Sequence, residues 1–434
     1  MKGTTVPEKV SLTGRFFRYD PDFFFIGEEI NQLSMVSVQE AKSLIQSTVP
    51  VLYPEQKNLS ETVGQVLAEE LVSPLALPPF RQSSMDGYAV HHADITRAGT
   101  LLPVVAESRA GNATLQTLQR GTAVHTLTGA PIPDGATAVV MKEKVDRTAD
   151  AAIIQQFPVP DGQNVRSVGQ QIQKGDVAMP KSTYLTPGSV GFLLGMNIHS
   201  VKVYRKPSVG ILVTGDELVQ PGDGVALEFG QIYESNSAML AAVLRSEGID
   251  DVSIRYVADN EAATIQALRE LTEQHDMVLS SGGISVGAYD FVGTALREIG
   301  VEEVFYKIRQ RPGKPLFFGR NDDTIVFALP GNPASTLVCY YEYVLPALRL
   351  MSGRTDCFLA KLKLPITHAF SFQGERDEFL KATATTEAVT PLYGQESFVL
   401  RSFAIANALI YLPSSQNSVQ PGDLVEVHLL PFFF

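Results

Sequence analysis

The segment from residue 207 to residue 350 alternates apolar runs with amphipathic stretches, and this alternation constrains the fold more than any other feature of the chain. Apolar runs predict buried strands at 209–215, 252–257, 277–283 and 324–331. Helical spacing of apolar residues predicts helices at 235–248, 260–274, 290–299 and 334–350. Strands and helices that alternate in this way predict a doubly wound parallel α/β sheet. Such sheets bind ligands at the carboxyl ends of their strands.

The chain before this segment has a different pattern. Residues 36–72 place apolar side chains at helical spacing, which predicts two helices joined by a loop at Pro54. Residues 78–161 alternate short β-prone runs with turns and predict an inserted β domain. The chain then returns to its first unit, so we assign 35–77 and 162–205 to one domain.

The two ends of the chain are distinct again. After the α/β domain, assigned to 206–350, residues 355–434 contain short strands with Gly and Pro turns, which predict a C-terminal β-barrel. Residues 1–34 are aromatic and acidic without periodicity, and we interpret them as an extension. The chain as a whole predicts a multidomain α/β plus β fold.

The charge balance limits the partners that we expect. The 434 residues include 47 acidic and 35 basic side chains, a formal net charge of −12. This acidic balance argues against nucleic acid and anionic membranes as partners. No apolar run reaches the roughly 18 residues of a membrane span, and no signal-peptide pattern is present. Only two cysteines occur, Cys339 and Cys357, outside any C-x-x-C pair, and together these features predict a cytoplasmic protein.

Three glycine-rich turns follow predicted strands: TGDEL at 214–218, SSGGISVGAYD at 280–290 and LPGNPAS at 329–335. Strands of one parallel sheet direct these turns toward one crevice. Their glycines let the backbone approach a phosphate closely: Gly215, Gly282, Gly283, Gly287 and Gly331. One such turn alone would be an ordinary βα connection, but three of the same character predict a phosphate-binding site.

Acidic residues in these turns predict a metal site. Asp216, Glu217 and Asp290 lie within the turns, and Asp259 follows the second strand. Clustered carboxylates repel one another unless a cation bridges them, and oxygen ligands without histidine suit Mg²⁺. We predict Mg²⁺ contacts for Glu217, Asp290 and Asp216, with helix capping as the alternative role of Asp290.

The motif RPGKP at 311–315 adds positive charge. A Pro-Gly turn holds Arg311 and Lys314 in one loop, which suits an oxyanion. Two cations alone would more often be part of a solvated surface.

Residues 283–287, GISVG, also fit the G-x-S-x-G pattern of a hydrolase nucleophile. That role needs an acid and a histidine downstream. Only His368 and His428 follow Ser285, and both lie in the predicted C-terminal domain. We therefore interpret Ser285 as part of an anion cradle and not as a nucleophile.

Six motifs in order give the chain a family resemblance from about Met35 to its C-terminus. They are PPFRQSSMDGYAV (78–90), TGAPIPDGATAVVMKE (128–143), TGDEL, SSGGISVGAYD, RPGKP and LPGNP. Together they resemble the molybdopterin molybdenumtransferase family, which includes bacterial MoeA and the E domain of gephyrin. The resemblance implies an elongated, L-shaped, four-domain subunit that forms a homodimer, with 35–77 and 162–205 in dimerisation. It also implies that the α/β domain is similar to that of the molybdopterin-adenylylating proteins.

The resemblance implies roles for individual residues. It implies catalytic roles for Asp86, Glu217, Asp259, Asp290 and Lys314. It implies substrate contacts for Thr128, Arg166, Gly215, Asp216, Ser281, Gly282, Gly283, Ser285, Gly287, Lys307, Arg311, Pro315, Gly331, Asn332, Arg376 and Ser397. Asp86, Thr128 and Arg166 match residues that enter the cleft from the partner subunit. The loop 311–315, with Arg376 and Ser397, matches the molybdate-binding region.

The implied reaction takes adenylylated molybdopterin and molybdate and releases AMP and molybdenum cofactor with the help of Mg²⁺. The implied partners are a second copy of the chain, the molybdopterin-adenylylating protein and apo-molybdoenzymes. The sequence departs from the family pattern in having Gln170 and Gln171 after the NVR motif and Lys381 where an arginine is frequent. A molybdopterin adenylyltransferase or related nucleotide hydrolase is the alternative enzyme, and a non-catalytic scaffold is the third possibility.

Overall fold

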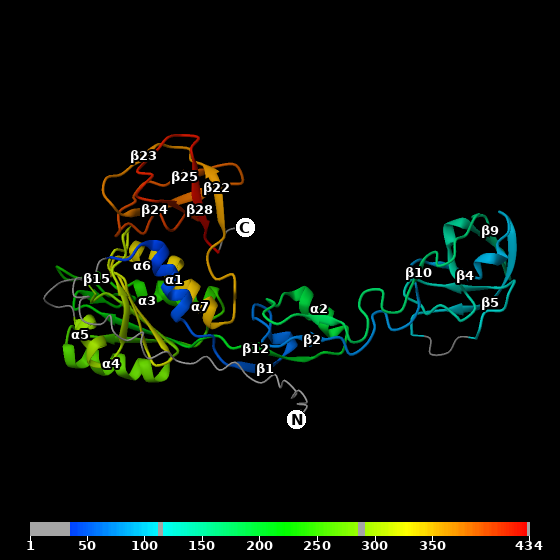
Figure 1. The fold of residues 1–434 in the computed structure, drawn as a ribbon, viewed down its shortest axis with the longest axis horizontal. Helices are drawn as coiled ribbons and strands as arrows, with labels where there is room; N and C mark the ends of the chain where they lie inside the picture. Colours follow the sequence, from blue (N-terminus) through cyan, green and yellow to red (C-terminus); the bar gives the residue numbers. More distant parts are fainter. Residues whose placement is uncertain (1–34, 112–115, 285–290, 432–434) are drawn as a thin grey trace, which may run out of the picture.

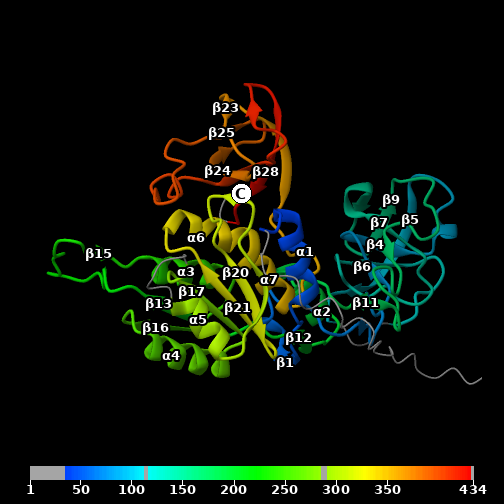
Figure 2. The same cartoon turned by 60° about the vertical axis from the view of Figure 1, so that its left-hand side comes forward.

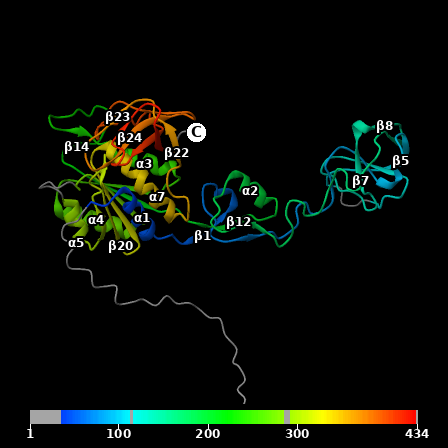
Figure 3. The same ribbon diagram turned by 45° about the horizontal axis from the view of Figure 1, so that its top comes forward.

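The computed structural model describes residues 35–111, 116–284 and 291–431. The subunit is elongated and L-shaped: an α/β module carries a C-terminal barrel above it, and a small linker module separates both from an inserted β module (Figure 1). Figure 3 shows the same separation from another direction. The multidomain α/β plus β fold is confirmed. The predicted extension, residues 1–34, lies outside the described residues.

The α/β module is built on a six-stranded sheet in the order β16–β13–β17–β21–β20–β18. The first four strands run parallel, as predicted, whereas β20 and β18 are antiparallel to their neighbours. The sheet is therefore mixed, because a hairpin extends its parallel part. Its strands are β13 (Val209–Thr214), β16 (Val252–Val257), β17 (Met277–Ser281), β18 (Glu302–Tyr306), β20 (Phe317–Asn321) and β21 (Thr324–Leu329).

Helices cover both faces of this sheet. Successive residues of a strand point to opposite faces, so Ile211 packs in the core beneath α3, α6 and α7, while Leu212 packs beneath α4 and α5. Helix α1 joins the first of these cores through Val38, Ala41 and Ile45. The helices are α1 (Val38–Thr48), α3 (Asn236–Ser246), α4 (Glu261–Gln274), α5 (Phe291–Glu298), α6 (Pro333–Cys339) and α7 (Leu345–Met351), with a π-helical turn, η5 (Tyr340–Val344), between the last two.

A narrow arm extends from the α/β module beside the carboxyl ends of its strands. It contains β14 (Leu218–Val219) and β15 (Ile232–Tyr233), which pair in parallel. Figure 2 shows this arm projecting from the body of the module.

The linker module joins chain segments from both sides of the inserted module. Strand β1 pairs with β12 and β2 with β11, all antiparallel. The second helix predicted within 36–72 is wrong, because this backbone forms strand pairs, a short 3₁₀ turn and isolated bridges instead. The elements are β1 (Pro54–Asn58), η2 (Leu59–Glu61), β2 (Leu71–Val72), β11 (Val177–Met179), α2 (Pro187–Leu194) and β12 (Ser200–Tyr204).

The inserted β module contains a six-stranded sheet in the order β7–β4–β6–β5–β9–β8. A short pair, β3 with β10, lies where the chain enters and leaves it. The elements are β3 (Gln82–Ser83), β4 (Gly87–Val90), η3 (His92–Asp94), β5 (Thr100–Ser108), β6 (Ala123–Thr126), β7 (Ala138–Met141), η4 (Lys142–Lys144), β8 (Val145–Arg147), β9 (Ala151–Ile154) and β10 (Val165–Arg166).

The C-terminal barrel is a sheet in the order β19–β24–β26–β28–β22, with β25 paired to β24 and a separate pair, β23 with β27. Its first strand, β19 (Gln310–Arg311), belongs to the loop that follows β18 in the α/β segment of the chain. This loop pairs with β24 and so forms the edge of the barrel sheet. The other strands are β22 (Lys361–Pro365), β23 (Phe370–Ser371), β24 (Asp377–Ala384), β25 (Val389–Pro391), β26 (Ala408–Leu412), β27 (Ser418–Val419) and β28 (Leu424–Leu429). In the part of the chain that the structure describes, every helix is too short or too polar to cross a bilayer.

Candidate active site

One pocket opens where β13, β17 and β21 end, at the edge predicted for a ligand. Its volume is about 680 Å³, and we call it the strand-end pocket. Residues from all three glycine-rich turns line it. The predicted residues among its lining are Gly215, Glu217, Asp259, Ser281, Gly282, Gly283, Pro315, Gly331 and Asn332.

Two consecutive glycines form one wall of the strand-end pocket from backbone. Gly282 and Gly283 have φ angles of +90° and +67°, which residues other than glycine rarely adopt. A Cβ on Gly283 would lie 2.6 Å from Cγ2 of Val292 and 3.1 Å from Oγ1 of Thr214. The turn therefore excludes a side chain at Gly283, because it packs against Val292 and Thr214, and this wall of the pocket is made of backbone. The rest of the predicted cradle, Ser285 and Gly287, lies outside the described residues.

Asn236, the first residue of α3, braces two of the turns. Its Nδ2 donates to Oγ of Ser281 (2.9 Å) and to the carbonyl oxygen of Gly331 (2.8 Å). Just before it, the buried carboxylate of Glu234 caps α3 by accepting hydrogen bonds from the N–H and the hydroxyl of Ser237. The sequence alone does not single out Asn236, because a polar residue at the start of a helix is explained by capping.

The acids at the strand-end pocket differ in their partners. The N–H of Asp216 donates to Oδ2 of Asp259 (3.3 Å), and the N–H of Asp259 donates to Oδ1 of Asp216 (3.0 Å). This exchange ties the loop after β13 to the loop after β16. The carboxylate of Glu217, which lines the pocket, has no hydrogen bond or ion pair within residues 35–111, 116–284 and 291–431.

The predicted Mg²⁺ site depends on how many carboxylates meet at the strand-end pocket. Within the described residues, no three His, Cys, Asp or Glu side chains converge as a metal site. Asp290, a predicted ligand, lies outside these residues. Mg²⁺ is usually held by one or two carboxylates together with substrate phosphates, and Glu217 and Asp259 supply two carboxylates to the pocket. These residues fit a cation that the substrate helps to hold, and not a metal cage made by protein alone.

The C-terminal barrel supplies another wall of the strand-end pocket. Phe398 lines the pocket, and the carbonyl oxygen of Ser397 accepts hydrogen bonds from the N–H groups of Ala334 (3.1 Å) and Ser335 (3.3 Å) at the start of α6. The Ser397 hydroxyl accepts a hydrogen bond from Nδ2 of Asn332 (2.9 Å). The predicted Ser397 is thus beside the LPGNP turn, although sequence reasoning missed Phe398.

Lys381, one of the departures from the family pattern, supports this wall. Its side chain is buried, and its Nζ donates to the carbonyl oxygens of Glu396 (3.2 Å) and Val399 (2.9 Å). Lys381 therefore holds the loop that carries Ser397. The other departure has a local role: Oε1 of Gln170 accepts a hydrogen bond from the N–H of Ser167 (3.1 Å) and closes its own turn.

The RPGKP loop lies at the seam between the α/β module and the barrel. Its Arg311 is in β19, and Pro315 lines the strand-end pocket. The backbone carbonyl of Lys314 accepts a hydrogen bond from the N–H of Ile308 (3.0 Å). The ammonium of the predicted Lys307 lies 4.5 Å from the centre of its neighbour's tyrosine ring. The loop thus reaches the strand-end pocket through Pro315, whereas Lys307, Arg311 and Lys314 are not among the residues that line the pocket.

A buried acid, Glu378, accompanies this loop. Its side chain is 7% exposed, and its Oε1 lies 3.6 Å from Nη1 of Arg311. Burial raises the pKa of Glu378 to about 6, although Arg311 and Arg376 both oppose the rise. Sequence reasoning named Arg376 but missed Glu378, because an acid next to a predicted oxyanion site conflicts with simple charge matching.

The predicted residues of the inserted β module form a separate cluster. The carboxylate of Asp86 accepts hydrogen bonds from the N–H (2.8 Å) and hydroxyl (2.9 Å) of Thr128, and Nζ of Lys142 lies 3.5 Å away. The Thr128 bonds, and then Lys142, lower the pKa of Asp86. Arg166 lies in β10, at the entrance of the module. Within one chain the linker module separates this cluster from the strand-end pocket (Figures 1 and 3).

The two downstream histidines lie away from the glycine turns. His368 is on an exposed turn of the barrel, and His428 is buried between the carboxylates of Glu342 (2.7 Å) and Glu426 (2.8 Å). Neither histidine lines the strand-end pocket. This arrangement agrees with the interpretation that the GISVG motif is not a nucleophile elbow.

Known protein families match most of the length of the chain. Three sequence families match consecutive segments: the "MoeA N-terminal region (domain I and II)" at residues 36–196, a "Probable molybdopterin binding domain" at 210–350 and the "MoeA C-terminal region (domain IV)" at 363–430. These segments correspond to the linker and inserted modules, the α/β module and the barrel.

Relatives that match almost the whole length of the chain belong to the same family. A molybdopterin molybdenumtransferase from Haemophilus influenzae is 34% identical over 410 residues, which is 91% of this chain and 100% of that protein. Molybdopterin molybdenumtransferase 2 from Mycobacterium tuberculosis is also 34% identical, over 91% of this chain and 99% of that protein.

The fold has a counterpart among solved structures. The molybdopterin biosynthesis MoeA protein from Pyrococcus horikoshii OT3 superimposes with a TM-score of 0.79 at 29% identity, over 92% of this chain and 100% of that one. Because sequence families, relatives and fold agree along the whole described chain, the protein belongs to the MoeA family of molybdopterin molybdenumtransferases.

Proposed function

We propose that this chain transfers molybdenum from molybdate to adenylylated molybdopterin and releases AMP, which completes the molybdenum cofactor. The observation that carries the proposal is the composition of the strand-end pocket. It combines a wall of glycine backbone, the carboxylate of Glu217 and an adjoining cationic loop. A phosphate-bearing substrate, a divalent cation and an oxyanion need these three features in one place.

Each group has a role in this proposal. Backbone N–H groups near Gly282 and Gly283 bind substrate phosphate, and Asn236 keeps their turn in place. The cationic loop with Arg311, Lys314 and Pro315, together with Arg376 and Ser397, orients molybdate.

Glu217 and Asp259 would hold Mg²⁺ together with the predicted ligands Asp216 and Asp290. The reciprocal hydrogen bonds between Asp216 and Asp259 keep those two acids together. When bound, Mg²⁺ offsets the negative charge that develops on the departing AMP.

We propose that the active site is shared between two subunits of a homodimer. Asp86, Thr128 and Arg166 of one subunit would complete the strand-end pocket of the other. Their distance from this pocket within one chain supports the proposal (Figure 3). A protein that adenylylates molybdopterin must supply the substrate, and apo-molybdoenzymes must accept the product. We place this work in the cytoplasm.

A direct test supplies purified protein with adenylylated molybdopterin, MgCl₂ and molybdate and follows the release of AMP. We expect AMP release that depends on molybdate, together with activation of an apo-molybdoenzyme. If the protein instead converts molybdopterin and MgATP to the adenylylated form without molybdate, the adenylyltransferase alternative is correct.

A substitution separates molybdate binding from pterin binding. Lys314→Ala should raise the molybdate concentration needed for half-maximal rate by about tenfold or more, because one charge-assisted contact is lost. The requirement for adenylylated molybdopterin should change much less. The matched control Lys174→Ala changes an exposed lysine outside the pocket and should leave both requirements unaltered.

A further inference from the structure

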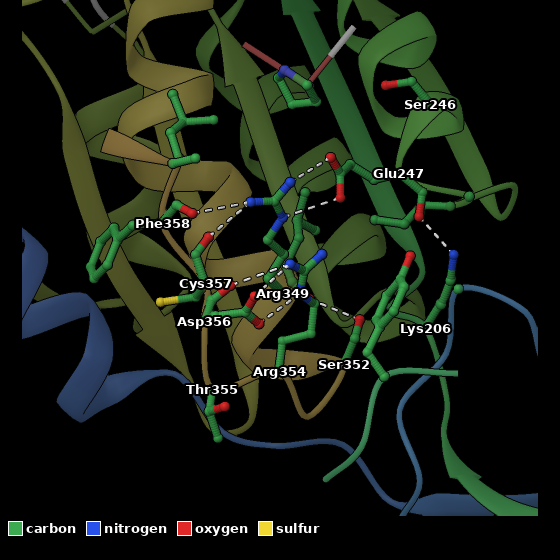
Figure 4. Close-up of a pocket in the computed structure, with 18 of the residues that line it drawn as sticks. Lys206, Ser246, Glu247, Arg349, Ser352, Arg354, Thr355, Asp356, Cys357 and Phe358 are labelled. Carbon is green, nitrogen blue, oxygen red and sulfur yellow. Dashed lines mark hydrogen bonds and ion pairs between the residues drawn. The ribbon is translucent and has the colours of Figure 1, made fainter. Parts of the chain in front are cut away.

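A second pocket, which we call the junction pocket, lies where the linker module, the α/β module and the barrel meet (Figure 4). Its volume is about 780 Å³, and it shares no lining residue with the strand-end pocket. Tyr184 comes from the linker module, Lys206 and Arg349 come from the α/β module, and residues 354–360 lead into the barrel. Ligand sites are frequent at such junctions, and the volume lies in the range of metabolite pockets.

Arg349 builds the wall of the junction pocket. Its Nε and Nη2 pair with the carboxylate of Glu247 (3.2 and 3.0 Å), and its Nη1 donates to the carbonyl oxygens of Cys357 and Phe358 (both 3.3 Å). Figure 4 shows the guanidinium enclosed by these partners. Arg349 and Glu247 therefore neutralise each other, and the guanidinium fixes the chain that leads to the barrel.

The ammonium of Lys206 has fewer hydrogen-bond partners than the guanidinium of Arg349. Its Nζ donates to the carbonyl oxygen of Glu247 (2.6 Å), and no carboxylate of the described residues lies within 4 Å of it. Burial lowers its pKa, and the nearby cations Lys57 and Arg354 lower it further, while Glu247 and Asp250 oppose this effect. A half-buried ammonium with one backbone partner retains donors for an anion.

A glycine makes room for this ammonium. Gly248 ends α3 with φ +69°, and a Cβ there would lie 2.2 Å from Nζ of Lys206. The local backbone thus keeps the ammonium at the edge of the junction pocket.

Arg354 is the second cation of the junction pocket. Its guanidinium carbon lies 5.1 Å from the ring centre of Tyr184, which orients it. Its ion-pair partner, Asp356 (3.2 Å), is 82% exposed. Nε and Nη2 of Arg354 donate to the two carboxylate oxygens of Asp356 (3.3 and 3.2 Å), but because this carboxylate is exposed to water, a ligand oxygen can compete with it for the guanidinium.

We propose that the junction pocket binds the phosphate group of a small molecule between Lys206 and Arg354. Two cations face one cavity, and one of them lacks a carboxylate partner among the described residues. A tetrahedral dianion matches their combined charge and accepts hydrogen bonds from the ammonium and from the planar guanidinium. The phosphate is either inorganic or part of a phosphate ester. The proposal does not depend on the reaction at the strand-end pocket.

Calorimetric titration at constant ionic strength tests this site with two probes, inorganic phosphate and glycerol 3-phosphate. Both titrations use protein carrying Lys314→Ala, so that the cationic loop of the other pocket contributes little. We expect binding that Lys206→Met weakens by about tenfold or more and that Arg354→Gln weakens similarly, because each removes one charge-assisted contact. Tighter binding of the ester would identify a phosphorylated metabolite as the ligand, and equal or tighter binding of phosphate would identify the inorganic ion.

The controls separate binding from folding. Lys206→Met also removes a hydrogen bond at the end of α3, so its thermal midpoint is measured alongside. Arg354→Gln loses its ion pair with the exposed Asp356 and its contact with the Tyr184 ring, so its thermal midpoint is measured as well, and binding is compared at a temperature at which both variants are folded. Lys174→Met, at an exposed position elsewhere, should bind both probes normally. Absence of binding at millimolar concentration, or affinity that both pocket variants leave unchanged, would overturn the proposal.

Discussion

The Nδ1 atom of His428, in barrel strand β28, lies 2.7 Å from Oε1 of Glu342, in the buried π-helical turn of the α/β module. Glu342 also accepts a hydrogen bond from Lys42 of α1, and Nε2 of His428 lies 2.8 Å from Glu426. This chain of charged groups, which is buried except at Glu426, joins α1, the α/β module and the barrel. Because the barrel contributes Phe398 to the strand-end pocket, these contacts also hold one wall of the site.

His428 should make the stability of the contact between the barrel and the α/β module depend on pH. Burial disfavours the imidazolium, but Glu342 and Glu426 outweigh burial and raise the pKa of His428. The resulting stability is fully present below the ordinary histidine pKa of about 6.5 and is lost as pH rises through the raised value. His428→Gln should lower stability by about 1–3 kcal/mol at pH 6 and by less at pH 9. Thermal midpoints measured across this range would contradict the assignment if both proteins showed the same pH dependence.

Asn236 should matter for activity more than for stability. Asn236→Ala removes two hydrogen bonds and should cost about 1–2 kcal/mol of stability. Since the braced turns form the pocket wall, KM for adenylylated molybdopterin should also rise. The matched control is Thr186→Ala, which removes the cap of α2 in the linker module at a similar cost of about 1 kcal/mol. Equal losses of activity in the two variants would show that Asn236 acts through stability alone.

Glu217 should control the response to Mg²⁺. Glu217→Gln keeps the shape of the side chain but removes the charge, so AMP release should fall by about tenfold or more. Higher Mg²⁺ concentrations should recover part of this loss. Glu228→Gln changes an exposed acid on the neighbouring arm and should behave as wild type. An unchanged Mg²⁺ dependence in Glu217→Gln would remove Glu217 from the metal site.

The contribution of Glu378 to stability should change with pH in the opposite direction to that of an ordinary ion-paired acid. Because burial raises its pKa to about 6, its ionisation costs stability. This cost is absent below the ordinary value of 4.5, develops as pH rises from there through about 6 and is complete above it. Glu378→Gln should therefore stabilise the protein at pH 8, by up to about 2 kcal/mol, and have little effect at pH 4.

The same substitution should ease anion binding at pH 8, because it removes a negative charge beside Arg311. Titration with molybdate measures this effect, with Glu387→Gln, at an exposed position elsewhere on the barrel, as the control. A destabilised Glu378→Gln variant at pH 8 would mean that the Arg311 ion pair outweighs the cost of burial.

The local part of the site could be predicted from sequence, and the reason is topological. Parallel strands end at one edge, so the turns around Gly215, Gly282 and Gly331 had to converge once the strands were recognised. Glycines at tight turns leave a clear signal in the sequence.

Long-range contacts left no such signal. The pattern of apolar residues within 36–72 suits a helix throughout, but after α1 the pairing of β1 with β12 and of β2 with β11 overrides it. The brace made by Asn236 joins residues 45 and 95 positions away, and Glu378 becomes unusual only through burial against another module. Neither the antiparallel β20 and β18 nor the distance of Asp86 from the pocket could be read from local pattern.

Subunit complementation tests the shared active site most directly. One subunit carries Asp86→Ala and the other Glu217→Ala, and differently tagged copies are co-expressed so that mixed dimers can be purified. A mixed dimer would contain one site with an intact Glu217 from one chain and an intact Asp86 from the other. We predict that each variant alone is inactive in forming molybdenum cofactor and that the mixed dimer recovers about half of the wild-type rate. A mixed dimer as inactive as its parents would contradict the proposal that two subunits build each site.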